Sequence, residues 1–276
     1  MTGARSVAVA RTMLFVPGNR LDRLGRAASA GADELILDLE DSVAQDAKND
    51  ARDAVVASLA SAPATVRINP TGTPWHDDDL AALASARQLR AVVIPKAEAT
   101  GDVRAVARRL APHVLMLPLI ETARGLIAAR AIAASNAVAR VMFGNVDFAL
   151  DLGITVSTGE PELLHARQEL VLASRAARLP GPADGVHLHL DDGAGLRVAT
   201  VMARNLGFTG KLCVHPRQIP IVHAALRPCE EDLAWARRVV QATVDAPRGA
   251  SRLDDQLVDE PVLARARRLL ESAVEG

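Results

Sequence analysis

MLPLIETARG at residues 116–125 and VMFGNVDFALDLG at residues 141–153 share one plan. Each begins with a short apolar run that is typical of a buried strand. Each run stops close to a carboxylate, Glu121 in the first stretch and Asp147 in the second. If the two strands are parallel neighbours, both carboxylates reach the same rim of the sheet. There they can hold one hard divalent cation and leave positions for water and substrate oxygens.

The same unit, a short apolar run followed by a helical pattern, recurs along the chain. Eight such strand–helix units match a (β/α)8 TIM barrel in number and size. A doubly wound sheet is the alternative, but eight evenly spaced units favour closure. The predicted strands span residues 12–18, 33–41, 65–70, 91–96, 114–120, 140–145, 183–190 and 211–216.

The C-terminal part of the chain lies outside these eight units. Residues 230–246 and 262–276 have helical patterns, with a short hairpin or extended loop between them. We therefore predict a catalytic barrel at residues 1–228 and a C-terminal helical lid extension at residues 229–276. The lid would cover the mouth of its own barrel or that of a neighbouring subunit.

Composition narrows the possible partners and locations. The 276 residues are 49% hydrophobic and carry a formal net charge of -1, so no global field attracts nucleic acid or an anionic membrane. No run of about 18 uncharged apolar residues is present to span a bilayer. The only cysteines, Cys213 and Cys229, have no metal-binding spacing, and the N-terminus has no apolar signal region. These features predict a reduced, cytoplasmic protein.

Polar residues fall at the predicted strand ends, where barrels of this kind place their catalytic groups. Asp38 and Glu40 share one face of the second strand by its two-residue period, and Arg67 and Asn69 share one face of the third. Lys96 ends the fourth. An inward Arg67 among acids is either a buried ion pair or a functional group. Burying such charges without function is costly, which favours function.

Each acid at the next two strand ends has a simpler explanation when taken alone. Glu121 could compensate the dipole of the helix that follows it, and Asp147 could cap a loop. Only their equivalent positions on successive strands favour a metal site.

Three further features have two interpretations each. Arg20, Arg23 and Arg26 are spaced to form one helical stripe that could grip the phosphates of a long ligand such as coenzyme A, or a solvated basic face. His187 and His189 share a predicted strand face that would suit zinc, but spacing places no further histidine or cysteine beside them. Lys96 is the sole Schiff-base candidate, although charge pairing explains it more simply.

Several motifs occur together over nearly the whole chain, with Lys48 and Arg52 following the second. They are LFVPGNR (14–20), GADELILDLEDSV (31–43), VRINPTGTPW (66–75), VVIPKAE (92–98), LPLIETARG (117–125), FGNVDFALDLG (143–153), KLCVHPRQI (211–219) and LVDEP (257–261). In this combination the chain resembles the citrate lyase beta-subunit-like family, with the malyl-CoA and citramalyl-CoA lyases, in the metal-dependent pyruvate-aldolase superfamily.

The resemblance implies a role for individual residues. Glu121 and Asp147 would bind Mg²⁺, or Mn²⁺, and Arg67 would hold the carboxylate or carbonyl end of the substrate. Glu40 is a further candidate catalytic residue. Asp259, on the lid of an adjacent subunit, would complete the site as an acid or base, so homotrimers or their multiples are expected.

The resemblance also implies where a coenzyme A arm would lie. It would run along the region from Phe15 to Arg26, which includes Pro17 and Gly18. Phe15 stands where some relatives have tyrosine, and Asp255 stands where the lid pattern usually has glycine.

The expected activity is a Mg²⁺-dependent, reversible Claisen-type cleavage of a 3-hydroxyacyl-CoA to a keto acid and an acyl-CoA. The thioester would be of the citramalyl, malyl or citryl type. One alternative is a citrate lyase beta subunit that acts only on a carrier-protein-bound thioester within a complex. A second is a pyruvate-type aldolase that forms a Schiff base through Lys96.

Overall fold

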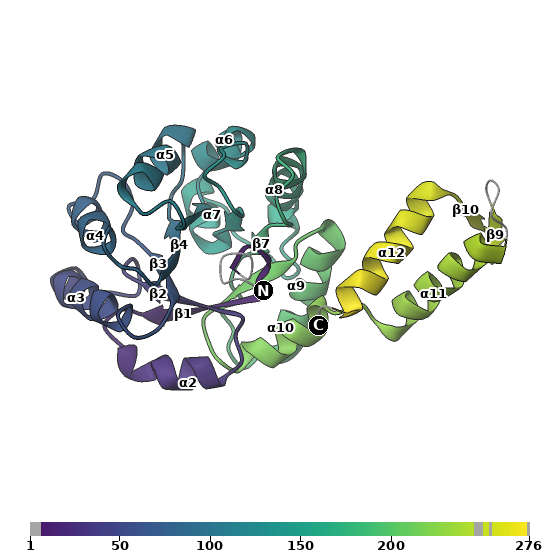
Figure 1. The fold of residues 1–276 in the computed structure, drawn as a ribbon, viewed down its shortest axis with the longest axis horizontal. Coiled ribbons are helices and arrows are strands. Elements are labelled where there is room, and N and C mark those ends of the chain that lie inside the picture. The colour runs from purple at the N-terminus through teal and green to yellow at the C-terminus, as the bar shows by residue number, and fades with distance from the viewer. Residues whose placement is uncertain (1–6, 246–250, 254–255, 275–276) are drawn as a thin grey trace. The chain divides into compact units, whose positions relative to one another are not determined.

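The computed structural model describes residues 7–245, 251–253 and 256–274. Parallel strands form a closed barrel in which each strand pairs with the next and the last pairs with the first (Figure 1). This confirms the predicted TIM barrel and excludes the doubly wound sheet. The strands are β1 (Thr12–Pro17), β2 (Glu34–Asp38), β3 (Ala64–Arg67), β4 (Leu89–Ile94), β5 (Leu115–Ile120), β6 (Met142–Phe143), β7 (Ala183–Asp184) and β8 (Gly210–Cys213).

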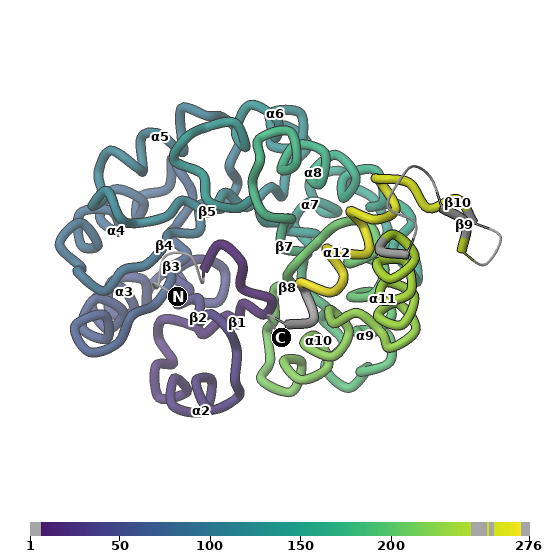
Figure 2. Tube along the Cα trace, turned by 45° about the vertical axis from the view of Figure 1, so that its right-hand side comes forward, coloured from purple at the N-terminus to yellow at the C-terminus, as the bar shows by residue number. Residues whose placement is uncertain are grey.

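Helices follow the strands and surround them as an outer layer (Figure 2). The alternation expected from the sequence is therefore present around the whole barrel. The helical elements are η1 (Leu21–Arg23), α2 (Leu24–Ser29), η2 (Gln45–Ala47), α3 (Lys48–Ser58), α4 (His76–Leu83), α5 (Thr100–Arg109), α6 (Ala123–Ala133), α7 (Asn145–Leu152), η3 (Pro161–Leu163), α8 (Leu164–Ala176), α9 (Gly193–Leu206) and α10 (Gln218–Leu226).

Apolar side chains from the strands fill the barrel. Met13 on β1, Ile36 on β2, Leu117 on β5 and Leu212 on β8 belong to one buried cluster. Each is almost fully buried because alternate residues of a strand point to the same side of the sheet. This packed interior leaves the strand ends as the place where polar side chains can meet.

A buried arginine ties together the short strands on one side of the barrel. Arg140, just before β6, is fully buried. Its Nε donates to the carbonyl oxygen of Gly181 at 2.9 Å, and its Nη2 donates to Oγ1 of Thr209 at 2.9 Å. Its Nη1 donates to the carbonyl oxygen of Ala10 at 2.5 Å. One side chain thus connects the segments that lead into β1, β6, β7 and β8, of which β6 and β7 have only two residues each.

The seventh strand is shorter than the sequence predicts. It ends at Asp184, and the following loop is held by a side chain: Asn145 accepts from the amide of Val186 at 2.9 Å and donates to its carbonyl oxygen at 3.1 Å. A Cβ on Gly185 would collide with Asn145, so the close approach needs glycine. The prediction that His187 and His189 share a strand face is therefore wrong, because both lie in this loop.

Residues 224–276 form a second compact unit, separate from the unit that ends at His223. It consists of α11 (Glu230–Asp245), the antiparallel pair β9 (Ser251–Leu253) and β10 (Gln256–Val258), and α12 (Glu260–Val274). Ala236, Val239, Val258, Leu263 and Ala266 form its own buried core. The helices and the hairpin lie where the sequence places them. The packing of this unit on a neighbouring subunit stays a prediction.

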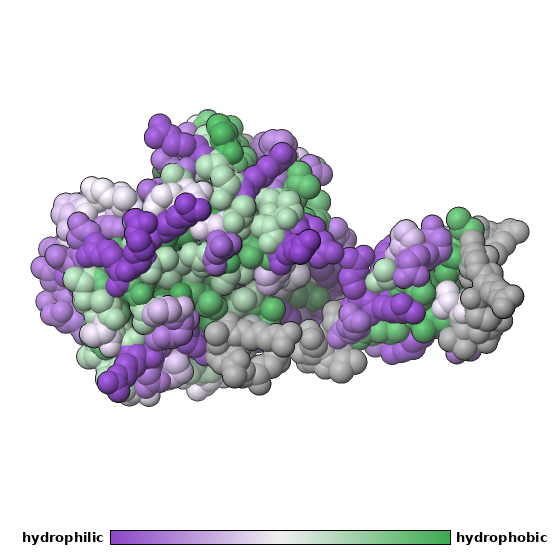
Figure 3. Space-filling model, turned by 45° about the horizontal axis from the view of Figure 1, so that its top comes forward, coloured by the Kyte–Doolittle hydropathy of each residue, from purple (hydrophilic) through white to green (hydrophobic). Residues whose placement is uncertain are grey.

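The surface of the barrel unit is mixed in character. Hydrophilic and hydrophobic residues are interspersed over the face drawn in Figure 3. Apolar side chains such as Ile127 on α6 and Leu150 on α7 are largely exposed. Among the described residues, no helix is both long and apolar enough to cross a lipid bilayer.

Candidate active site at the carboxyl ends of the strands

Glu121 is fixed in place directly after β5. The residue is 1% exposed, and its Oε1 accepts a hydrogen bond of 2.7 Å from the backbone amide of Lys96. Thr122, not Glu121, caps α6, because the Thr122 hydroxyl accepts from the amide of Gly125. A Cβ on Gly144 would collide with the Glu121 carboxylate. Glu121 is therefore held by the Lys96 amide, while the capping of α6 falls to Thr122.

Lys96 joins three acids. While its amide binds Glu121, its Nζ lies 2.9 Å from Oε1 of Glu40 and 3.9 Å from Oδ1 of Asp147. Asp147 is in the first turn of α7, and its side chain is about one-third exposed. Carboxylates that follow β2, β5 and β6 are thus gathered around one lysine; the binding of a metal by Glu121 and Asp147 stays a prediction.

Arg67 is held by Asp38, an acid that the sequence analysis placed at the strand ends without giving it a role. Its Nε and Nη2 donate to the two carboxylate oxygens of Asp38 at 2.6 and 2.7 Å. Its Nη1 lies 2.9 Å from Oε2 of Glu40, and its Cζ lies 4.7 Å from the ring centroid of Phe15. The buried ion pair that the sequence analysis considered for Arg67 is present, with Asp38 as its partner. The Nη1 atom of Arg67 faces Glu40. The shared strand face of Asp38 and Glu40 was the signal for this role.

Lys48, unlike Lys96, is buried and supports the end of β2. Lys48 is 6% exposed, and its Nζ donates to the carbonyl oxygens of Leu39 and Glu40 at 2.7 and 2.8 Å. Its third hydrogen bond, of 2.7 Å, goes to Oδ1 of Asn69. Asn69 is itself held by Asp79, which accepts from its amide and from its side chain. Hydrogen bonds from Lys48 therefore hold the backbone that carries Glu40.

Negative charge is in excess at this rim. Burial and the charges of Glu40 and Asp147 raise the pKa of Glu121 to about 8. A bound cation would offset this repulsion. Asp38, Glu40, Asp41, Glu121 and Asp147 carry more formal negative charge than Arg67 and Lys96, the cations that contact them, can neutralise.

The donor set suits a hard divalent cation. Mg²⁺ prefers oxygen ligands and usually takes only one or two carboxylates, with water and substrate oxygens completing the shell. Among residues 7–245, 251–253 and 256–274, no group of three or more His, Cys, Asp or Glu side chains could hold a metal. Glu121 and Asp147 fit such a cation only if the remaining ligands are substrate and water.

The residues predicted to follow a coenzyme A arm lie at the end of β1 and beyond. The amide of Gly18 donates to the carbonyl oxygen of Asp38 at 2.8 Å, so Pro17 and Gly18 border the Arg67 pair. Arg23 and Arg26 are exposed, in η1 and α2. Arg20 is not on the predicted helical stripe, because it precedes the helical turn and pairs with Asp22 at 3.0 Å.

Asp259 lies in the second unit, just before α12. Its Oδ1 accepts a hydrogen bond of 3.2 Å from the amide of Val262, so it caps that helix. Asp259 is an exposed residue. Its catalytic role toward a neighbouring barrel stays a prediction.

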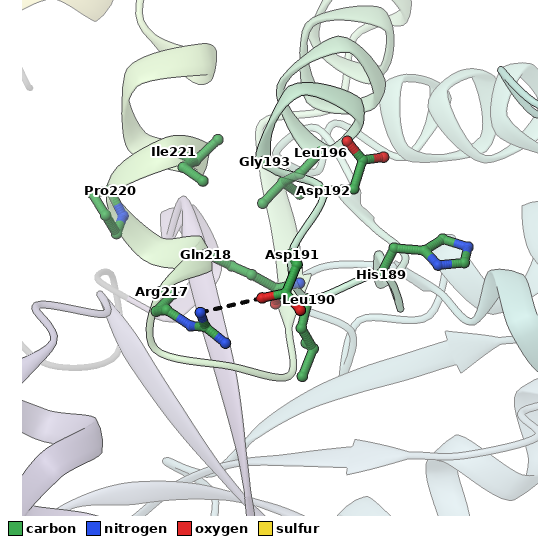
Figure 4. A pocket seen from close by; sticks show the side chains of 10 residues that line it. All are labelled: His189, Leu190, Asp191, Asp192, Gly193, Leu196, Arg217, Gln218, Pro220 and Ile221. Atoms are coloured by element: carbon green, nitrogen blue, oxygen red, sulfur yellow. Dashed lines mark ion pairs between the residues drawn. The ribbon is translucent and has the colours of Figure 1, made fainter.

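The loop after β7 borders a separate cavity of about 450 Å³. Asp191 and Arg217 form an ion pair of 3.3 Å there, and the ring of His189 is directed away from them (Figure 4). His187 and His189 contact each other edge to face, with ring centroids 5.8 Å apart.

A closed (β/α)8 barrel with buried acids, an arginine and a lysine gathered at its strand ends defines a class of enzymes that carry their chemistry on that rim. The model of the HpcH/HpaI aldolase/citrate lyase family matches residues 11–216. The chain belongs to this family, which confirms the resemblance found in the sequence.

Three known proteins illustrate the range within the family. The chain is 34% identical over 273 residues to a (3S)-malyl-CoA thioesterase of Cereibacter sphaeroides, with 95% of this chain and 94% of that protein covered. It is 30% identical over 284 residues to the human mitochondrial citramalyl-CoA lyase, with 93% and 83% covered. Its structure is similar to that of CitE from Mycobacterium tuberculosis in complex with magnesium, acetoacetate and coenzyme A, with a TM-score of 0.85, 37% identity and 97% and 99% coverage.

Proposed function

We propose that this protein is a Mg²⁺-dependent carbon–carbon lyase. It cleaves a 3-hydroxyacyl-CoA reversibly into a keto acid and an acyl-CoA. The observation that carries the proposal is the gathering of Glu40, Glu121 and Asp147 around Lys96, next to the Nη1 atom of Arg67. The magnesium, acetoacetate and coenzyme A bound by the similar CitE protein support it.

Glu121 and Asp147 would hold the metal, with Mn²⁺ as a possible substitute for Mg²⁺. When bound, the metal supplies a Lewis acid to the carboxylate and carbonyl oxygens of the keto acid, an effect worth several kcal/mol. Arg67 adds a fixed positive charge for the same oxygens, and Asp38 and Phe15 keep its guanidinium in one orientation. Charge that develops on the substrate oxygen is thereby stabilised without movement of the protein.

Glu40 is the base of the proposed cleavage. Its carboxylate lies between Arg67 and Lys96, on backbone that Lys48 holds. It takes the proton of the substrate hydroxyl. The hydroxyl oxygen then becomes the carbonyl oxygen of the keto acid as the carbon–carbon bond breaks. The electron pair of the broken bond goes to the acyl-CoA, which leaves as a thioester enolate. Asp259 of a neighbouring subunit protonates the enolate carbon. General acid–base catalysis of this kind contributes about 10²- to 10⁴-fold.

The proposal includes an assembly and a route for the coenzyme. The lid of one subunit covers the barrel of the next in a homotrimer or a multiple of three. The coenzyme A arm passes Pro17 and Gly18, and its phosphates meet Arg23 and Arg26, which are exposed on that side.

Thioester hydrolysis is the second candidate function, because one relative is a (3S)-malyl-CoA thioesterase. The two reactions differ in their products. A lyase releases a keto acid and an acyl-CoA, whereas a thioesterase releases free coenzyme A and the intact hydroxy acid. Product analysis of malyl-, citramalyl- and citryl-CoA incubated with purified protein and Mg²⁺ separates them, and keto acid is the expected product.

Turnover measurements also test the metal, the form of the thioester and Schiff-base chemistry. Loss of turnover in chelator and in Asp147→Asn is expected, and full activity in chelator would refute the metal role. Activity seen only with a carrier-protein thioester would instead indicate a subunit of a larger complex. Borohydride trapping with pyruvate would reveal a Schiff base at Lys96, and turnover by Lys96→Arg would exclude one.

A further inference from the structure

Lys96 has an unusual backbone conformation for its residue type. Its φ is +47°, in the left-handed region that residues with a side chain rarely adopt. Glycine would take this conformation without strain. The conformation lets the amide of Lys96 bind Glu121 while its side chain reaches Glu40 and Asp147. Strain of this kind persists where it serves a function, so the side chain itself needs an explanation.

Glu40 and Glu121 are each held by contacts other than the Lys96 ammonium group, whereas that group ends a partly exposed side chain. The Glu40 side chain is 4% exposed and bound to Arg67. Glu121 is bound to the Lys96 amide and packed on Gly144. The Lys96 side chain is 37% exposed and ends a flexible four-carbon stem. It can therefore withdraw to solvent while Glu40 and Glu121 stay in place.

We propose that the Lys96 ammonium group and a divalent cation compete for the Asp147 carboxylate. Lys96 neutralises Glu40 and Asp147 until the cation binds Asp147 and Glu121, and it then moves away. Lys96 thereby lowers the affinity of the protein for the divalent cation and makes its release easier. This inference rests on the proposed metal site.

Mn²⁺ binding to the full-length protein, followed by the electron paramagnetic resonance signal of the free ion, tests the competition without any substrate. In Lys96→Met the Kd for Mn²⁺ is expected to fall about tenfold, because a positive charge a few ångströms from the ion is removed. Lys96→Arg keeps the charge and is expected to bind as the wild type does. An equal or larger Kd in Lys96→Met would overturn the proposal.

Two further variants keep the result unambiguous. Arg124→Met removes the same charge from the first turn of α6, where the side chain is 81% exposed and paired with Glu98, and less than a twofold change is expected. Lys96→Gly removes the side chain and the strain together. It is expected to fold and to bind Mn²⁺ as tightly as Lys96→Met, and it decides the question if Lys96→Met does not fold.

Failure of the metal site and failure of this inference give different results. If Glu121→Gln and Asp147→Asn both leave the Kd for Mn²⁺ unchanged, the metal site itself is wrong. If they weaken binding while Lys96→Met and Lys96→Gly do not strengthen it, only the competition is wrong.

Discussion

Asp38 grips Arg67 through two parallel hydrogen bonds of 2.6 and 2.7 Å, and the carboxylate is almost fully buried. Asp38→Asn is expected to lower kcat/KM more than about a hundredfold, because the guanidinium loses its fixed orientation. The free energy of unfolding should also fall by about 3 kcal/mol, since a buried pair is broken. Steady-state kinetics and urea unfolding measure the two effects, and unchanged kcat/KM would show that Arg67 needs no such support.

The fully buried Asp184 makes the stability of the barrel depend on pH. Burial alone would raise its pKa, but the charges of Lys211 at 2.7 Å and Arg167 at 2.8 Å hold the pKa of Asp184 below its usual value. An acid with a lowered folded pKa stabilises the fold above its unfolded pKa of 3.8 and loses this contribution as the pH falls through the folded value.

Asp184→Asn is therefore expected to lower the free energy of unfolding at pH 7 by about 3 to 5 kcal/mol, because buried Lys211 loses its charged partner and Arg167 keeps only Glu160. The variant should also show a flatter decline in stability below pH 4. Urea titrations between pH 3 and pH 7 measure both, and parallel curves for the two proteins would contradict the assignment.

Gly144 is expected to be essential for metal binding. In Gly144→Ala the new methyl group meets the Glu121 carboxylate and must displace it. The Kd for Mn²⁺ should rise at least about tenfold because one ligand is misplaced. Gly101→Ala, on α5 with open space at its Cβ, is the matched control and should bind metal normally. Normal binding by both variants would show that Glu121 is not a ligand.

Arg140 is expected to matter for stability and not for catalysis. Burial lowers its pKa to about 10, and its hydrogen bonds go to backbone carbonyls and the Thr209 hydroxyl. Arg140→Met leaves these acceptors unsatisfied, at a cost of about 1 to 3 kcal/mol for each buried group. Thermal unfolding should begin well below the wild-type temperature, while KM measured at low temperature stays the same. A changed KM would place Arg140 in the functional site.

Mixing two inactive variants tests the role of Asp259 across subunits. Asp259→Asn and Asp147→Asn should each be inactive alone. In oligomers reassembled from equal amounts of both, about one quarter of the sites combine an intact barrel with an intact neighbouring lid. Activity should recover to that level, as measured by keto acid release. No recovery in confirmed mixed oligomers would argue against a shared site.

The sequence determined the barrel, the family and the two acids after β5 and β6. Strand–helix alternation is a local pattern, and eight evenly spaced units favour closure of the sheet. Glu121 and Asp147 could be singled out because residues at equivalent positions on parallel strands share a rim. The extent of β7 could not be predicted, because Asn145, far away in the chain, takes the hydrogen bonds of Val186.

Only the tertiary structure decided which charged side chains pair with one another. Asp38 rather than Glu40 accepts two hydrogen bonds from Arg67. Lys96 adopts a left-handed backbone conformation in which its amide binds Glu121 while its side-chain Nζ binds Glu40. Such choices depend on which groups lie within about 3 Å after the barrel closes, and on backbone strain that the surrounding packing sustains. A linear sequence states neither the distances between these groups nor the strain of the backbone.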